Sequence, residues 1–204
     1  MTLVLGLTGG IASGKSTADD FFKKQQLPII DSDLIAHDIL NVGEAGYHQV
    51  VQQFGSNFLN PDQTINRHQL GEVVFSDPKQ LSILNKITHP LIFQIIQTKI
   101  TQNKQAGEQL VILDAPVLFE SGAQKYCDKT LLITVPEEMQ IKRLMARDGL
   151  TRKAALNRIN SQMPLAKKVK LADYVITNTG TIEELEAQLA QLLLKLKGEK
   201  NGMS

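Results

Sequence analysis

Five short apolar runs, each bounded by glycine, proline or polar residues, recur along the chain. Each run is too short for a helix and suits a buried strand. Segments in which apolar residues recur at helical spacing separate the runs. The alternation therefore predicts an α/β fold in three layers around a five-stranded parallel sheet. The predicted strands lie at residues 3–7, 27–30, 110–114, 130–135 and 172–177.

The stretch from residue 34 to about 105 contains no run of the strand type. Its apolar residues recur at helical spacing between turn signals. Thr88-His89-Pro90 is predicted to open the longest helix, because proline is tolerated in a first helical turn. About 70 residues is too much for one crossover helix, so we expect a helical insertion that binds substrate.

Two helical regions follow the fourth run. The first, about residues 137–170, is a second excursion from the sheet. The second begins at Thr181-x-x-Glu184, which is a capping box. Its leucines at 185, 189, 192 and 196 share one face, which we expect to pack on the sheet. The chain is thus predicted to be one domain over residues 1–204, with a core of about 1–33, 106–136 and 171–198.

Residues 9–17 read Gly-Gly-Ile-Ala-Ser-Gly-Lys-Ser-Thr and stand between the first predicted strand and a helical pattern. This arrangement is typical of a P-loop, whose glycines adopt backbone angles closed to other residues and let the chain approach a phosphate. Its N–H groups form an anion nest at a helix N-terminus. Lys15 is placed to reach the β- and γ-phosphates, and Ser16 to ligate Mg²⁺. The predicted nucleotide site comprises Gly10, Ile11, Ala12, Ser13, Gly14, Lys15, Ser16 and Thr17.

Carboxylates end two predicted strands, where ligands of open α/β sheets bind. After the second run, Asp31 is as well explained as a helix cap, whereas Asp33 is the better candidate for a base that orients and deprotonates an acceptor hydroxyl. Asp114 closes the third run and is expected to face Mg²⁺, directly or through water. For Glu120, an acceptor contact and simple solvation both stay open.

Basic residues gather in the second excursion. Arg143 and Arg147 are four residues apart and therefore share one helix face. Arginines above a phosphoryl donor neutralise charge in the transition state, and we prefer this interpretation to a solvated basic face. For Arg152 and Arg158 the two interpretations are balanced.

Composition narrows the class of protein. The formal net charge is +1, so no basic field argues for nucleic acid or an anionic membrane as a partner. No apolar run approaches the roughly 18 residues of a membrane helix, and the N-terminus lacks a signal-peptide pattern. Cys127, the single cysteine, is interpreted as a small, partly buried apolar residue, and the four histidines lack metal-ligand spacing. We expect a cytoplasmic protein, and no pattern predicts its oligomeric state.

Six segments of the sequence, taken in order and beginning with the P-loop, resemble the dephospho-CoA kinase family, within the nucleoside-monophosphate-kinase-like P-loop fold. A P-loop by itself is shared by many NTPases, whereas the ordered set is much more specific. Ser32 and Val117 stand where the family usually has alanine and leucine, and both departures leave the carboxylates intact. The matching segments are residues 7–17, 31–37, 89–90, 114–120, 143–148 and 172–178.

The resemblance implies transfer of the γ-phosphoryl group of ATP to the ribose 3′-hydroxyl of dephospho-CoA, the last step of coenzyme A synthesis, with Mg²⁺ as cofactor. It implies that residues 34–105 form an acceptor-binding subdomain and residues 137–170 a lid. Asp33, Lys15 and Arg143 are then catalytic, Arg147 belongs to the lid, and Asn178 to the adenine site. Acceptor contacts are expected at Asp33, His37, His89 and Glu120.

Three other functions remain open at this stage. A P-loop kinase for another nucleotide or a small alcohol would share the chemistry and differ only in its acceptor helices. A GTP-binding switch is disfavoured, because Ala-Pro-Val follows Asp114 in place of the D-x-x-G pattern, and Asn85-Lys86-Ile87-Thr88 lacks the aspartate of N-K-x-D. An ATPase or motor without an acceptor would have Asp33 buried away from the P-loop.

Overall fold

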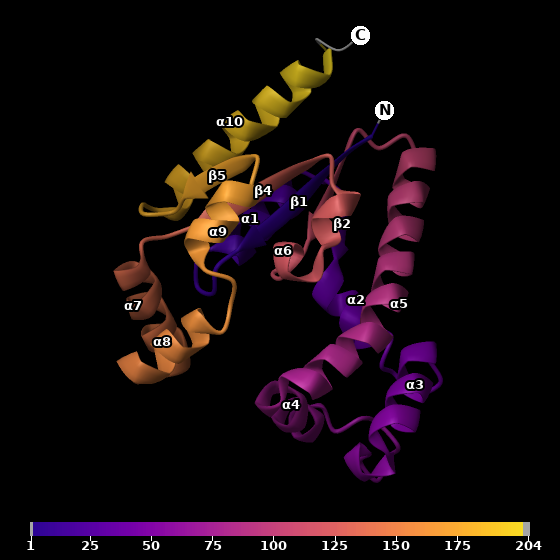
Figure 1. Cartoon of the computed structure of the whole chain (residues 1–204). Coiled ribbons are helices and arrows are strands. Elements are labelled where there is room, and N and C mark those ends of the chain that lie inside the picture. Colours follow the sequence, from indigo (N-terminus) through magenta and orange to yellow (C-terminus); the bar gives the residue numbers. More distant parts are fainter. Residues whose placement is uncertain (1, 202–204) are drawn as a thin grey trace. The chain divides into compact units, whose positions relative to one another are not determined.

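The computed structural model describes residues 2–201, with side chains as far as residue 198. The chain forms two compact units (Figure 1). The first comprises the residues up to 29 and from 103 onward, and the second comprises residues 30–102. Within the described residues, no helix combines the length and the apolar character needed to cross a bilayer.

The sheet has five strands in the order β2-β3-β1-β4-β5, as the alternation of apolar runs predicts. β1 lies at its centre and pairs in parallel with β3, where Leu5 is opposite Ile112, and with β4, where Leu7 is opposite Leu131. β4 pairs in parallel with β5. The strands are β1 Leu3–Gly9, β2 Ile29–Asp31, β3 Leu110–Asp114, β4 Lys129–Thr134 and β5 Tyr174–Thr177.

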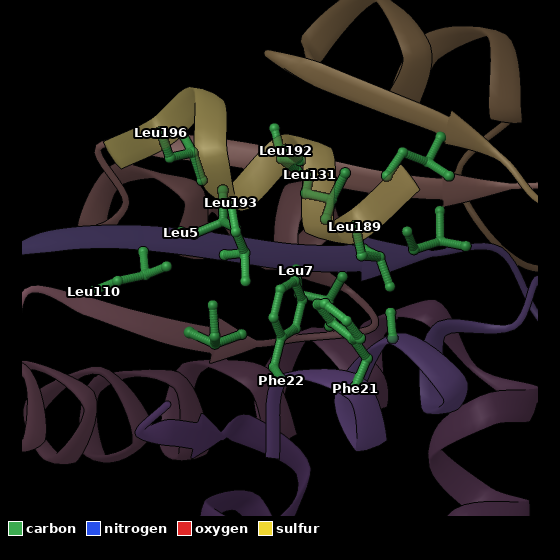
Figure 2. Packing of buried hydrophobic residues seen from close by; sticks show 14 of the residues in the cluster. Leu5, Leu7, Phe21, Phe22, Leu110, Leu131, Leu189, Leu192, Leu193 and Leu196 are labelled. Atoms are coloured by element: carbon green, nitrogen blue, oxygen red, sulfur yellow. The ribbon is translucent and has the colours of Figure 1, made fainter. Parts of the chain in front are cut away.

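Helices α1 (Lys15–Lys24) and α10 (Ile182–Asn201) cover one face of this sheet. Alternate residues of the central strands, such as Leu5 and Leu7, point to this side and are fully buried. Figure 2 shows Phe21 and Phe22 of α1 meeting this apolar face together with leucines of α10. The predicted leucine stripe of α10 is buried at all four positions, Leu185, Leu189, Leu192 and Leu196, which confirms that it packs on the sheet.

The opposite face of β1 packs against the segment that follows β3. A Cβ atom placed on Gly6 would lie 2.6 Å from the Cys127 sulfur and 2.9 Å from the Leu118 side chain, so only glycine fits there. Burial, with Asp128 and Asp173 nearby, raises the pKa of Cys127 to about 12, which keeps the thiol protonated. The remaining helices of this unit are α6 Leu118–Ser121, η2 Ala123–Tyr126, α7 Glu137–Asp148, α8 Arg152–Asn160 and α9 Leu165–Leu171.

The second unit is helical and has its own apolar cluster, which includes Tyr47, Val50, Ile65, Leu70 and Val74. The carboxylate of Asp31 caps its first helix, accepting hydrogen bonds of 2.9 Å from the N–H groups of residues 33 and 34. The helices are α2 Ser32–Asp38, α3 Ala45–Phe54, η1 Ser56–Phe58, α4 Arg67–Ser76 and α5 Pro78–Gln105.

The prediction that a helix begins at Thr88-His89-Pro90 is wrong, because α5 runs without a break through Pro90. The helix begins instead at Pro78, and the Asp77 carboxylate accepts a 2.8 Å hydrogen bond from the Lys79 N–H. Pro90 lacks an N–H, and proline within a helix is tolerated where the helix bends. Figure 1 shows α5 changing direction along its length.

Candidate active site

The P-loop joins β1, which ends at Gly9, to α1, which begins at Lys15. Gly14 is the N-cap of α1 and has φ +96°, a left-handed conformation that disfavours other residues. Its carbonyl accepts hydrogen bonds from the N–H groups of Thr17 and Ala18, which begin the helical ladder. The loop therefore presents backbone N–H groups at the N-terminus of α1, as an anion nest requires.

Gly9 and Gly10 do not adopt the unusual backbone angles predicted for the glycines of the loop, because neither has a positive φ. Glycine is needed at these two positions because neighbouring side chains leave no room for a Cβ atom. A Cβ atom on Gly9 would lie 2.6 Å from the Ser13 hydroxyl, and one on Gly10 would lie 2.8 Å from the side-chain nitrogen of Gln140. The non-glycine residue Ala12 has φ +57°, so the turn of the loop falls there and at Gly14.

Three side chains from distant parts of the chain hold the backbone of this loop. The Ile11 N–H donates to Gln162 Oε1 at 3.0 Å, and Gln140 Nε2 donates to the Ile11 carbonyl at 2.7 Å. Asn178 Nδ2 donates to the Ser13 carbonyl at 2.9 Å. The resemblance pointed to Asn178 through the adenine site, whereas Gln140 and Gln162 carry no signal in the sequence, because each lies more than a hundred residues from its partner.

The Lys15 ammonium lies against two carboxylates. Its nitrogen is 2.6 Å from both oxygens of Asp114, at the end of β3, and 3.2 Å from Asp19 Oδ2, one turn along α1. Burial raises the pKa of Asp114 to about 7, Asp19 adds to the rise, and Lys15 opposes it. Burial lowers the pKa of Lys15, but the two carboxylates more than offset this and leave it raised. Asp19 is not among the predicted site residues, although its spacing of four residues from Lys15 is a signal for such a pair.

The oxygen ligands beside Lys15 suit Mg²⁺. Ser16 exposes its hydroxyl at the start of α1, and Asp114 offers a carboxylate at the adjacent strand end. Oxygen donors of this kind, with other positions left to water and phosphate, are what Mg²⁺ prefers. In the described part of the chain, no group of three or more His, Cys, Asp or Glu side chains could hold a metal ion.

A cavity of about 530 Å³ lies over the P-loop. Arg143 and Arg147 of α7 line it from one side, and the segment after β5 lines it from another, with Asn178 and Thr181. Arg143 forms no ion pair with any residue that the structure describes, whereas Arg147 is paired with Asp148 at 2.7 Å. Arg152 pairs with Glu138, and Arg158 with Asp148, so these two arginines make ion pairs within the α7–α8 region.

The other predicted site residues are distributed between the two units. Glu120 belongs to the first unit, where its Oε1 atom lies 2.7 Å from the Lys168 ammonium. Asp33, in the first turn of α2, and His37 are exposed residues of the second unit. His89 of α5 packs against the ring of Phe93 with centroids 5.5 Å apart, and burial lowers the pKa of its imidazole.

A phosphate nest with an adjacent lysine and hydroxyl, at the carboxyl edge of a parallel sheet and below two arginines, defines a phosphoryl-transfer enzyme of the P-loop kinase class. A family model for dephospho-CoA kinase matches residues 3–184. The chain therefore belongs to the dephospho-CoA kinase family.

Individual relatives agree with this assignment. The chain is 54% identical over 196 residues to a protein of Lactobacillus johnsonii named dephospho-CoA kinase, covering 96% of this chain and 99% of that one. It resembles the solved structure of dephospho-CoA kinase from Campylobacter jejuni, with a TM-score of 0.74 and 31% identity over 98% of this chain and 100% of the other. A protein of Thermus thermophilus gives a TM-score of 0.82 and 32% identity, covering 96% and 98% of the two chains.

Proposed function

We propose that this protein transfers the γ-phosphoryl group of ATP to the ribose 3′-hydroxyl of dephospho-CoA, which completes coenzyme A biosynthesis. Membership of the dephospho-CoA kinase family supports both substrates and the reaction. The observation that carries the proposal at the level of structure is the P-loop with Lys15 at the N-terminus of α1, beneath a cavity with two arginines. Such a site is built for a polyphosphate donor.

The donor half of the reaction follows from the residues around the P-loop. The N–H groups at the start of α1 bind phosphate oxygens, and Lys15 leaves its carboxylate partners to reach the β- and γ-phosphates. Arg143, which has no ion pair among the described residues, is available to neutralise charge on the transferred group, with Arg147 beside it. Stabilisation of this kind is the main contribution that a kinase makes to phosphoryl transfer.

Mg²⁺ is part of the proposal, with the Ser16 hydroxyl and the Asp114 carboxylate as the groups that would hold it. When bound, the ion would offset the negative charge of the phosphates. Both oxygens of Asp114 now accept hydrogen bonds from Lys15, which therefore competes with a cation for the carboxylate. Movement of Lys15 to the phosphates would therefore free the carboxylate for the cation.

The acceptor half rests on the second unit. We propose Asp33 as the base that orients and deprotonates the acceptor hydroxyl, and His37, His89 and Glu120 as contacts to the acceptor. The exposure of Asp33 supports its role, because a base must be accessible to substrate. In this proposal residues 34–105 are the acceptor-binding subdomain, residues 137–170 are a lid that excludes water, and the enzyme works in the cytoplasm.

The experiment that tests the function compares acceptors directly. ADP release from Mg²⁺-ATP is measured with dephospho-CoA, adenosine, AMP or no acceptor. A large stimulation by dephospho-CoA alone, with coenzyme A as the product, is expected. Equal turnover with every acceptor would favour a kinase of different specificity. Turnover that is just as high without any acceptor would favour an ATPase.

A further inference from the structure

Residues 162–163, which we name the bridge segment, connect α8 to α9 and are held at both ends by polar contacts. On one side, Gln162 Oε1 accepts the N–H of Ile11 in the P-loop at 3.0 Å. On the other side, the N–H of Met163 donates to Glu120 Oε1 at 3.2 Å. Two adjacent residues thus connect the P-loop to α6, although these elements are more than a hundred residues apart in the sequence.

Lys168 holds this arrangement from the interior. Its side chain is only 1% exposed, and its ammonium lies 2.7 Å from the same Glu120 oxygen that Met163 contacts. The ammonium also donates a longer hydrogen bond, of 3.4 Å, to the carbonyl of Pro116, which accepts a second one of 3.0 Å from the Thr8 hydroxyl. A buried ammonium is tolerated only when it is paired in this way, so it fixes the geometry of each partner.

The P-loop residue that the bridge segment contacts, Ile11, is also held by hydrogen bonds on both sides. Both polar backbone groups of Ile11 are bonded by glutamine side chains, the N–H by Gln162 and the carbonyl by Gln140. The side chain of Ile11 packs on the apolar cluster of α7 and α8, which contains Ile141 and Leu144. Displacement of Gln162 would therefore take from the Ile11 N–H the partner that it has in this structure.

We propose that Lys168 is a positioning residue for nucleotide binding. It holds Glu120, Glu120 holds Met163, and the adjacent Gln162 thereby keeps the P-loop at Ile11 in the conformation that receives phosphate. Lys168 does not itself line the cavity over the P-loop, and it reaches the wall of that cavity through the bridge segment and through its hydrogen bond to the Pro116 carbonyl. The inference rests on the proposed use of ATP and assigns to this lysine a role in the reaction.

The test is a double-mutant cycle read by nucleotide affinity. Lys168→Met, Gln162→Met and the double variant are titrated with Mg²⁺-ADP by calorimetry, without acceptor. Each single change should weaken binding by up to about tenfold, the factor that corresponds to the loss of one hydrogen bond. Because both act through one chain of contacts, the double variant should bind no more weakly than the weaker single variant. In Gln162→Met, which changes no proposed acceptor contact, steady-state kinetics should show a raised KM for ATP with the KM for dephospho-CoA unchanged.

The matched control is Lys167→Met, an exposed neighbour on the same helix, which should bind nucleotide as the wild type does. Wild-type affinity in Lys168→Met would overturn the inference. So would a double variant weakened by about a hundredfold, because independent effects multiply. The fold should survive Lys168→Met, since methionine fills the same space and the Glu120 side chain, 24% exposed, can take up water.

If Lys168→Met does not fold, Glu120→Gln replaces it in the cycle. The double variant Glu120→Gln/Gln162→Met should then bind nucleotide no more weakly than the weaker of its two single variants. Wild-type affinity for Mg²⁺-ADP in Glu120→Gln would refute the inference. So would an effect of Glu120→Gln that multiplies with the effect of Gln162→Met. The test is also separable from the proposed function. A wild-type protein that binds nucleotide but phosphorylates no dephospho-CoA would refute the function, whereas multiplying effects in an active kinase would refute only the role of Lys168.

Discussion

The Lys15 ammonium lies 2.6 Å from both carboxylate oxygens of Asp114, and 3.2 Å from Asp19. In this arrangement the lysine expected to bind the phosphates neutralises the carboxylate expected to bind Mg²⁺. ATP and Mg²⁺ would separate the pair together. The phosphates would take the place of Asp114 beside Lys15, and the cation would take the place of Lys15 beside Asp114. Without nucleotide, Lys15 therefore offsets part of the negative charge of Asp114 and Asp19.

Replacing Lys15 with alanine should impair both ATP binding and phosphoryl transfer. The variant loses the charge that reaches the β- and γ-phosphates, and transfer should fall by about a hundredfold or more. Calorimetric titration with Mg²⁺-ATP and a coupled ADP assay measure the two effects. Lys23→Ala, at an exposed position of the same helix, is the control. Undiminished ATP affinity in Lys15→Ala would remove this lysine from the phosphate site.

Replacing Asp33 with asparagine should abolish most transfer and leave ATP binding intact. An amide keeps the shape of the side chain but cannot accept the proton of the acceptor hydroxyl, and loss of a general base typically costs about a hundredfold to ten-thousandfold in rate. Single-turnover transfer to dephospho-CoA measures the loss, and ATP titration checks the donor site. Asp38→Asn, in the same helix, should remain active. Unchanged turnover in Asp33→Asn would exclude it as the base.

The raised pKa of Asp114 predicts how stability depends on pH. The native carboxyl, with a pKa of about 7, binds a proton at pH values where an unfolded one, at 3.8, has released it. The free energy of unfolding therefore falls as the pH rises between these values, by at most about 1.4 kcal/mol per pH unit. Asp114→Asn does not titrate, so its stability relative to the wild type should rise with pH.

Urea unfolding of the nucleotide-free proteins at about pH 5 and about pH 7 measures this difference. The control is Asp20→Asn, an exposed position in α1, which should follow the wild-type profile. Parallel profiles for the wild type and Asp114→Asn would show that Asp114 does not carry the expected proton.

Replacing Gly14 with alanine should weaken nucleotide binding and lower stability. Alanine is strained at φ +96°, and its Cβ would overlap the Asn178 amide that braces the loop. The strain alone costs about 1 to 2 kcal/mol. Gly122→Ala isolates that cost, because Gly122 has a similar backbone conformation, φ +79° and ψ 13°, with no atom near the position of the new Cβ. Thermal unfolding of the two variants should show the larger loss for Gly14→Ala, and equal losses would contradict the steric role of Asn178.

The sequence alone predicts features whose cause is local. A buried strand needs only a short apolar run, and the P-loop needs its glycines, Lys15 and Ser16 at fixed spacing, so both can be read from a few consecutive residues. The capping box is confirmed in the same way, since the N–H of Thr181 and the carboxylate of Glu184 lie 3.1 Å apart. Strong local signals of this kind also identify the family, because they recur in a fixed order.

Helix boundaries depend on more than the local pattern. Pro90 usually marks a helix start, but here α5 packs on both sides of the proline, through Leu84 and Ile87 before it and Ile96 and Ile100 after it, and this outweighs one missing hydrogen bond. The left-handed turn at Gly14 follows from the motif, whereas the need for glycine at residue 10 follows from the nearby Gln140 side chain. These differences arise because tertiary contacts add free energy that no window of sequence contains.

Only the tertiary structure decides which polar side chains meet. Gln140, Gln162 and Asn178 come from three distant segments and converge on the P-loop because α7, the bridge segment and the end of β5 surround it. In the sequence, Lys168 cannot be distinguished from the solvated lysines of a basic helix. Its burial against Glu120 depends on α9 folding back beside α6. A buried polar group must find its partner in space, and the sequence specifies that partner only through the complete fold.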